Sequence, residues 1–141
     1  TLGAFFLFAA ASSVFPLKNT IIYGHRMKDG SMFRKLEEYK DKDFWKENPY
    51  FYIYTPDGKE ITYKIYSVGQ VLDTSDTYLT SFAGEEDYQK FLDMTMKEAD
   101  YDTGVKVTTD DTIVTLSTCT AASDEHRFVV RGVKEKEVEL Q

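Results

Sequence analysis

Short runs of β-branched and aromatic residues recur along the chain and predict its strands. The clearest pair flanks Pro56-Asp57-Gly58, whose strong turn chemistry predicts a hairpin. A shorter run, Ile21-Ile22-Tyr23, is followed by Gly24, which predicts a buried strand that ends at a turn. Predicted strands cover residues 21–23, 50–54, 60–68, 105–108, 112–118 and 128–133.

Two stretches instead have helical spacing. Apolar residues recur from the N-cap residue Ser31 to Tyr39, and Asp41 or Asp43 can start a second short turn before Pro49. Residues 84–100 predict a longer helix with acids and lysines on one face. Its apolar face would hold Tyr88, Phe91, Leu92, Thr95, Met96 and Ala99. Because strands and helices do not alternate regularly, the pattern favours a mainly β barrel or sheet with helical insertions.

The size of the chain suits one domain, which we expect to span residues 1–141. Hydrophobic residues make up 42% and aromatics 15%, enough for a packed core. The longest apolar run, residues 4–17, is only about half of what a membrane-spanning helix needs, and Ser12, Ser13 and Pro16 interrupt it. It is similar to the core of a secretory signal, but no basic residues precede it and the chain opens on Thr1. We therefore expect a chain whose membrane anchor lies outside these residues.

Charge and cysteine content narrow the possible partners. The chain has 17 basic and 24 acidic residues, a net charge of -7, which is the wrong sign for binding nucleic acid. Its single cysteine cannot form an intrachain disulfide, and one cysteine with two separated histidines does not make a structural zinc site. The acidic pairs lack the spacing of a calcium loop, and Gly24, Gly30 and Gly58 are interpreted as turn residues and not as a phosphate-binding loop. We expect no metal or other cofactor.

Three residues that could do chemistry lie at the predicted ends of different strands: Cys119, His25 and Arg127. Taken singly, Cys119 would usually be a buried thiol, His25 a structural histidine in a turn, and Arg127 a solvated charge at a strand end. Together they fit acyl transfer, in which a thiolate attacks, an imidazole protonates the departing amine and a guanidinium stabilises the oxyanion. His126 could rival His25, but it adjoins Arg127 on a strand, where neighbours point to opposite faces.

These residues lie in motifs that resemble those of the sortases, cysteine transpeptidases of the Gram-positive cell surface. Thr115-Leu-Ser-Thr-Cys119 is similar to their Thr-Leu-x-Thr-Cys signature, and Asn19-Thr-Ile-Ile-Tyr-Gly-His25 to their histidine segment. Arg127, at the start of Arg-Phe-Val-Val, falls where their arginine does. The helix around residues 88–93 before the cysteine strand, and Ser117 ahead of Thr118-Cys119, look like class B sortases.

Resemblance to class B implies an eight-stranded β-barrel with helical insertions, including a helix before the cysteine strand. Class B domains carry N-terminal helices and early strands ahead of this sequence, so a barrel built from these residues alone would be left with unpaired strands. The stretch of residues 8–17 departs from the family pattern.

The resemblance also implies the reaction. A class B sortase cleaves a C-terminal sorting signal of the Asn-Pro-x-Thr type after its threonine and joins it to an amine of peptidoglycan or its lipid-linked precursor, at the outer face of the membrane. Cys119 would be the nucleophile, His25 the acid and base, and Arg127 the oxyanion residue. The walls of the peptide groove would include Ser117, Thr74 and Leu79.

Two other functions stay open. The first is a hydrolytic cysteine peptidase that uses the same site with water as acceptor. The second is a catalytically silent β-barrel that binds peptide or wall polymer, against which the joint presence of Cys119, His25 and Arg127 argues.

Overall fold

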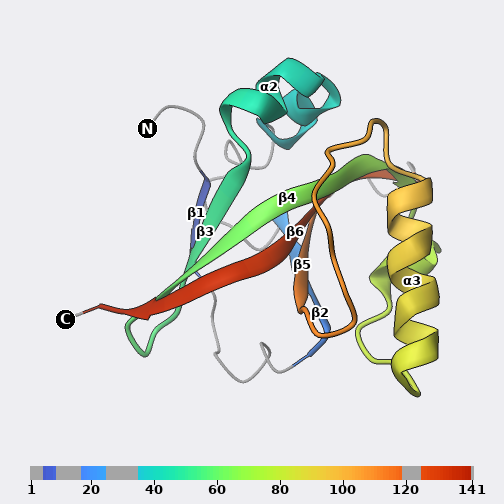
Figure 1. The fold of residues 1–141 in the computed structure, drawn as a ribbon. Helices are drawn as coiled ribbons and strands as arrows, with labels where there is room; N and C mark the ends of the chain where they lie inside the picture. The colour runs from blue at the N-terminus through green and yellow to red at the C-terminus, as the bar shows by residue number, and fades with distance from the viewer. Residues whose placement is uncertain (1–4, 9–16, 25–34, 119–124, 141) are drawn as a thin grey trace.

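The computed structural model describes residues 5–8, 17–24, 35–118 and 125–140, which form six strands and a few short helices (Figure 1). In chain order the elements are β1 (Phe5–Phe8), β2 (Asn19–Tyr23), the 3-10 helix η3 (Lys35–Lys40), α2 (Lys42–Glu47), β3 (Tyr50–Tyr54), β4 (Lys59–Leu72), the 3-10 turn η4 (Asp76–Tyr78), α3 (Glu85–Lys97), β5 (Ile113–Ser117) and β6 (His126–Glu139).

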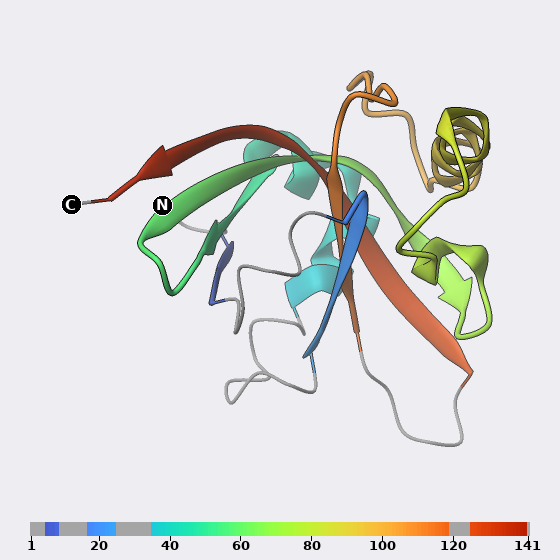
Figure 2. The ribbon, with the colours of Figure 1, turned by 90° about the horizontal axis from the view of Figure 1, so that it is seen from below.

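All six strands belong to one sheet, in the order β1-β3-β4-β6-β5-β2. Its centre is the long antiparallel pair β4 and β6, each of 14 residues. β3 pairs with β4 and β5 pairs with β6, both antiparallel, whereas β1 joins β3 and β2 joins β5 in parallel. The central strands are strongly arched, as Figure 2 shows.

The predicted mainly β fold with helical insertions is confirmed, but the closed eight-stranded barrel is not what the described residues form. Their sheet has six strands, and its two edge strands, β1 and β2, do not pair with each other. Both edge strands are short, with four and five residues, so they do not reach around the concave side of the arch.

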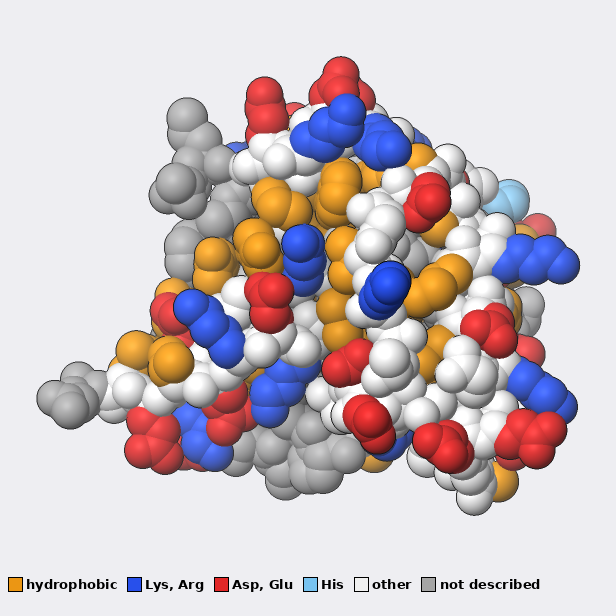
Figure 3. All heavy atoms as spheres, in the orientation of Figure 1, with side chains coloured by type: hydrophobic (Ala, Val, Ile, Leu, Met, Phe, Trp, Pro, Cys, Tyr) orange, Lys and Arg blue, Asp and Glu red, His pale blue; other side chains and the backbone are white. Residues whose placement is uncertain are grey.

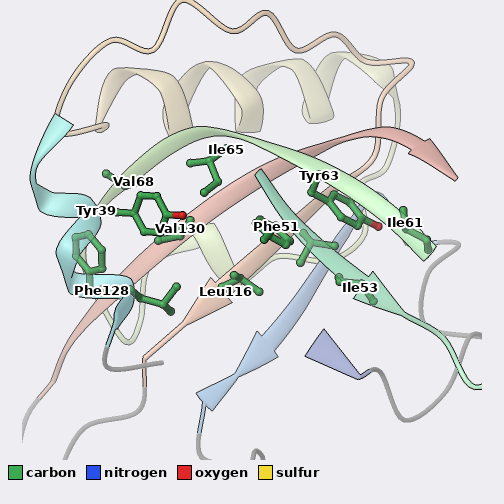
Figure 4. Packing of buried hydrophobic residues seen from close by; sticks show 12 residues of the cluster. Tyr39, Phe51, Ile53, Ile61, Tyr63, Ile65, Val68, Leu116, Phe128 and Val130 are labelled. Atoms are coloured by element: carbon green, nitrogen blue, oxygen red, sulfur yellow. The ribbon is translucent and has the colours of Figure 1, made fainter. Parts of the chain in front are cut away.

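Alternating side chains give the sheet two apolar faces. One face holds a cluster that includes Phe51, Ile65 and Val114, covered by Leu36 and Tyr39 from η3 (Figure 4). The opposite face packs against α3. That second cluster consists of Tyr66, Tyr88, Phe91, Leu92, Val107, Ile113 and Val133.

The helices are close to those predicted. Asp41 is the N-cap of α2, where its side chain accepts a hydrogen bond from the Asp43 backbone N–H at 2.9 Å. α3 carries three acidic residues in its first turn and buries Tyr88, Phe91, Leu92 and Thr95. The predicted burial of Met96 is wrong, since it is 38% exposed; Met94 packs against the cluster in its place. The start of the first predicted helix, residues 31–34, lies outside the described residues.

The strand predicted over 105–108 is also wrong. This segment runs alongside the sheet without joining its ladder, and Val107 is buried because it packs against α3 and the sheet face. Conversely, part of the apolar run over residues 4–17 forms β1, in register with β3. Among the described residues, no helix is long and apolar enough to cross a membrane.

β6 continues past its predicted end to Glu139, and β4 continues past its predicted end to Leu72. The last part of β6 pairs with the first part of β4, which β3 borders on its other side. Beyond Val133 the β6 side chains are exposed and mostly charged. Lys59 on β4 lies 3.6 Å from Glu137 on β6, and Lys134 lies 2.9 Å from the same glutamate. On the face drawn in Figure 3, acidic and basic side chains are interspersed.

Candidate active site

The ends of three neighbouring strands meet at one end of the sheet. β2 and β5 are parallel, with Tyr23 opposite Ser117, so the two strands end side by side. The antiparallel β6 begins at the same end, where Val129 lies opposite Ser117. Sequence positions 25 and 119 follow two residues after Tyr23 and Ser117. His25 and Cys119 themselves lie outside the described residues.

Arg127 lies near the start of β6, at this same end of the sheet. The pairing of β5 with β6 continues one residue further through Thr118, whose backbone N–H donates to the Phe128 carbonyl and whose hydroxyl accepts from the Phe128 N–H, both at 2.9 Å. Phe128, the residue after Arg127, therefore lies opposite Thr118. The structure thus brings Arg127 to the point where the chain continues to Cys119.

The Arg127 side chain is only 17% exposed. One guanidinium nitrogen donates to the His126 carbonyl at 2.9 Å, and the other lies 3.9 Å from a carboxylate oxygen of Asp73. The Asp73 N–H donates to the Glu125 carbonyl at 2.8 Å, which ties the end of β4 to the start of β6. The neighbouring His126 is exposed.

Asn19 holds the segment between β4 and α3 against β2 and β5. This asparagine is fully buried at the start of β2. Its amide nitrogen donates to the carbonyls of Thr77 at 3.0 Å and Leu79 at 2.7 Å, and its amide oxygen accepts from the Thr115 hydroxyl at 2.8 Å. One side chain therefore joins β2, β5 and η4.

Tyr78 contacts the last residues of both β2 and β5. Its ring stacks on Tyr23 with centroids 5.9 Å apart, and its hydroxyl shares a 2.8 Å hydrogen bond with Ser117. Burial raises the pKa of Tyr78, which keeps the phenol protonated at neutral pH. Tyr78 was missed in the sequence because no motif or period marks it; only the contacts bring it to the site.

The three predicted groove residues have different surroundings. Ser117 is fully buried beneath Tyr78 and donates to the Thr118 carbonyl at 3.1 Å. Thr74 is exposed in the turn after β4, and Leu79 is 47% exposed directly after η4. All three lie on or beside the segment that Asn19 holds.

A second arginine, Arg131, is fully buried in β6 and was also missed. Its guanidinium donates to Thr77, Ser67 and Glu98. A signal was present in the sequence, because a charge inside the apolar run Phe-Val-Val-Arg-Gly-Val must be paired if that strand is buried. Within the described ranges, no group of His, Cys, Asp and Glu side chains could hold a metal ion.

Comparison with known proteins agrees with this arrangement of strands and motifs. The Sortase domain family matches residues 6–135 of the chain. The chain belongs to the sortase family. Sortase B of Listeria monocytogenes is 40% identical to it over 119 residues, and sortase B of Staphylococcus aureus is 37% identical over 108 residues, covering 82% and 76% of the chain. These relatives place it in class B.

Solved sortase B structures share the fold. A Staphylococcus aureus sortase B-substrate complex superposes with a TM-score of 0.76 at 33% identity, covering 85% of this chain and 56% of that one. Clostridium perfringens sortase B gives 0.73 at 30% identity, covering 85% and 67%. The chain spans about half the length of the curated relatives it matches, 47% and 43%. The sortase family assignment therefore rests on this shared part.

Proposed function

We propose that this chain carries the catalytic centre of a class B sortase, a cysteine transpeptidase that attaches surface proteins to the cell wall. The observation that carries the proposal is the convergence of β2, β5 and β6 at one end of the sheet, because the sortase motifs with His25, Cys119 and Arg127 lie at those three strand ends. The site would lie at the outer face of a Gram-positive cell membrane, held there by an anchor outside these residues.

In the first half of the reaction, the Cys119 thiolate attacks the carbonyl carbon of the threonine in an Asn-Pro-x-Thr signal. The new C–S bond forms as the C–N bond breaks, and His25 gives its proton to the departing amine. Arg127 stabilises the negative charge on the carbonyl oxygen. The enclosed position of its guanidinium supports this role, since a charge largely shielded from water acts more strongly than one in solvent.

In the second half, an amine of peptidoglycan or its lipid-linked precursor attacks the thioester. His25 takes a proton from this amine, the C–N bond of the product forms and the thiolate leaves. No metal or cofactor is needed for either half. Cysteine and histidine ordinarily titrate near pH 8.5 and 6.5, so the peptide-cleavage rate should follow a bell-shaped pH profile.

The peptide would lie along the segment from Thr74 to Leu79, with Ser117 beneath it. This segment has an exposed apolar side chain, Leu79, and is fixed to β2 through Asn19 and to Ser117 at the end of β5 through Tyr78. The substrate complex solved for Staphylococcus aureus sortase B supports a peptide-binding role for the same fold.

The test uses residues 1–141 with any flanking sequence of the native protein, a signal peptide and increasing concentrations of triglycine or a cell-wall stem peptide. A transpeptidase diverts the product from free acid to amide as the amine concentration rises, which mass spectrometry measures. Only hydrolysed peptide with every amine would favour the hydrolytic cysteine peptidase. Binding of the peptide without cleavage would favour the silent binding module.

A further inference from the structure

The buried guanidinium of Arg131 has partners from three different parts of the fold. Nη1 donates to the Ser67 hydroxyl on β4 at 2.8 Å, and Nη2 donates to the carboxylate of Glu98, the C-cap residue of α3. Nε donates to the Thr77 hydroxyl in η4 at 3.0 Å. Each nitrogen therefore has a partner, as a charge with no solvent exposure requires.

This network fixes the end of α3 to the sheet. Ser67 donates in turn to the Thr95 carbonyl at 2.6 Å, and the Asp100 N–H donates to the Val68 carbonyl at 2.8 Å. The helix end is therefore attached to β4 by several bonds, of which the Arg131–Glu98 ion pair is one. Arg131 also joins η4 to β6, because its Nε donates to the hydroxyl of Thr77, a residue that is fully buried.

η4 is held from two sides by side chains of the sheet. Asn19 binds the Thr77 carbonyl from β2, and Arg131 binds the Thr77 hydroxyl from β6. Thr77 is fully buried, whereas the next residue, Tyr78, contacts both strand ends of the candidate site. A movement of Thr77 would therefore move Tyr78 and Leu79 directly.

The two arginines of β6 act on the same segment. Arg127 and Arg131 are four residues apart on one face of the strand, and they contact Asp73 and Thr77, which are also four residues apart. Arg127 lies near the start of β6 and is 17% exposed, while Arg131 is fully buried. β6 thus places Arg127 at the candidate site and Arg131 against η4, which lies beside that site.

We propose that Arg131 is a positioning residue that sets the peptide affinity of the site by fixing Thr77, and through it the 74–79 segment. The proposal rests on the proposed function, since the affinity concerned is that for the sorting signal. Arg131 touches no reacting atom, so its loss should act on KM for the peptide and leave the chemical step unchanged.

The test compares substitutions that remove single bonds of Arg131. Thr77→Val keeps the shape of the side chain but removes the acceptor for Nε, and Thr77→Ser keeps the hydroxyl. Ser67→Ala is the control, because it removes an equally buried bond to the same guanidinium, together with the Ser67–Thr95 bond to α3, without touching η4. Thr77→Val should raise the peptide KM about tenfold, the equivalent of about one hydrogen bond, at unchanged kcat. Thr77→Ser should restore it, and Ser67→Ala should lower stability with KM unchanged.

Hydrogen–deuterium exchange of the same variants separates this proposal from the proposed function. Thr77→Val should speed exchange in the 74–79 segment, and Ser67→Ala should not. Equal effects of Thr77→Val and Ser67→Ala on KM and exchange, or no effect of Thr77→Val, would overturn the positioning role. If the unaltered protein cleaves no signal peptide, the proposed function fails, and the exchange measurement still decides whether Arg131 fixes the segment.

Discussion

Gly132 is the position at which the close packing of the sheet can be tested most directly. A Cβ added there would lie 2.5 Å and 2.6 Å from two ring carbons of Phe51 and 2.9 Å from the Cβ of Tyr63, where ordinary contacts begin at 3.4 Å. Phe51 and Tyr63 stack with centroids 5.2 Å apart and are 0% and 2% exposed. To reach an ordinary contact, the Phe51 ring would have to move by nearly 1 Å within the closely packed core cluster shown in Figure 4.

We therefore expect Gly132→Ala to lower the free energy of unfolding. Overpacking of a core costs about 1–3 kcal/mol. The lower conformational entropy of the unfolded alanine variant offsets about 0.4–1 kcal/mol of this cost. The net loss should be about 1–2 kcal/mol. With a urea dependence of about 2 kcal/mol per molar, the midpoint of urea unfolding should fall by about 0.5–1 M. The backbone of Gly132 has no positive φ, so the loss is steric and not conformational.

Gly84→Ala is the matched control, because an added Cβ there meets nothing within 4 Å. Gly84 is the N-cap of α3 and makes no side-chain cap bond, so its substitution should cost about 0.5 kcal/mol, from the weaker capping by alanine and not from a clash. Adding Phe51→Leu to Gly132→Ala should cost less than the sum of the two single changes. A Gly132→Ala variant as stable as the unaltered protein, or strictly additive costs, would refute the packing argument.

Three further predictions concern the site, the core and the pH dependence of stability. Arg127→Ala should lower kcat for peptide cleavage by about 10²-fold, with poor rescue by lysine because a point charge cannot replace a planar fork; normal turnover with weaker peptide binding would contradict this. The buried Thr62 hydroxyl has no hydrogen-bond partner in the described part of the chain, so Thr62→Val should raise the free energy of unfolding by about 0.5–1 kcal/mol in urea titrations, and a loss would contradict it. Burial raises the pKa of Tyr66 and of Tyr101 to about 12, so stability should be complete below pH 10 and fall as the pH rises toward 12. Phenolate absorbance near pH 10 that the folded protein shows and its folded Tyr66→Phe variant lacks would contradict this.

The sequence was sufficient to predict an element where neighbouring residues alone determine it. The hairpin of β3 and β4 was predicted because turn residues separate two apolar runs, and its turn glycine, Gly58, has the positive φ of 88° that such a turn needs. The α3 face followed from helical period, apart from Met96.

Sequence failed where pairing or distant contacts decide the structure. Val105 and Val107 read as strand residues, but a β-branched pattern reports burial, which here comes from packing against α3 without a ladder. The last part of β6, Lys134–Glu139, was missed because its side chains are exposed and mostly charged and pair with β4 through contacts such as Lys59–Glu137. β1 becomes a strand only through its pairing with β3.

The same division holds for the candidate site. Short motifs at strand ends led to the region of His25, Cys119 and Arg127, and the register of β2, β5 and β6 brings those three strand ends together. Tyr78 and Arg131 depend on contacts 39 and 54 residues apart in the sequence, which no local pattern encodes.

The central claim is that Cys119 forms a thioester with the sorting signal. The most direct test is intact-protein mass spectrometry after mixing with an excess of an Asn-Pro-x-Thr peptide, with the adduct located by proteolysis. The account predicts an acyl adduct on Cys119, and neither adduct nor cleavage with Cys119→Ala, while His126→Ala, a change at an exposed neighbour of Arg127, still forms the adduct. Cleavage by Cys119→Ala at the unaltered rate, or an adduct on another residue, would contradict it.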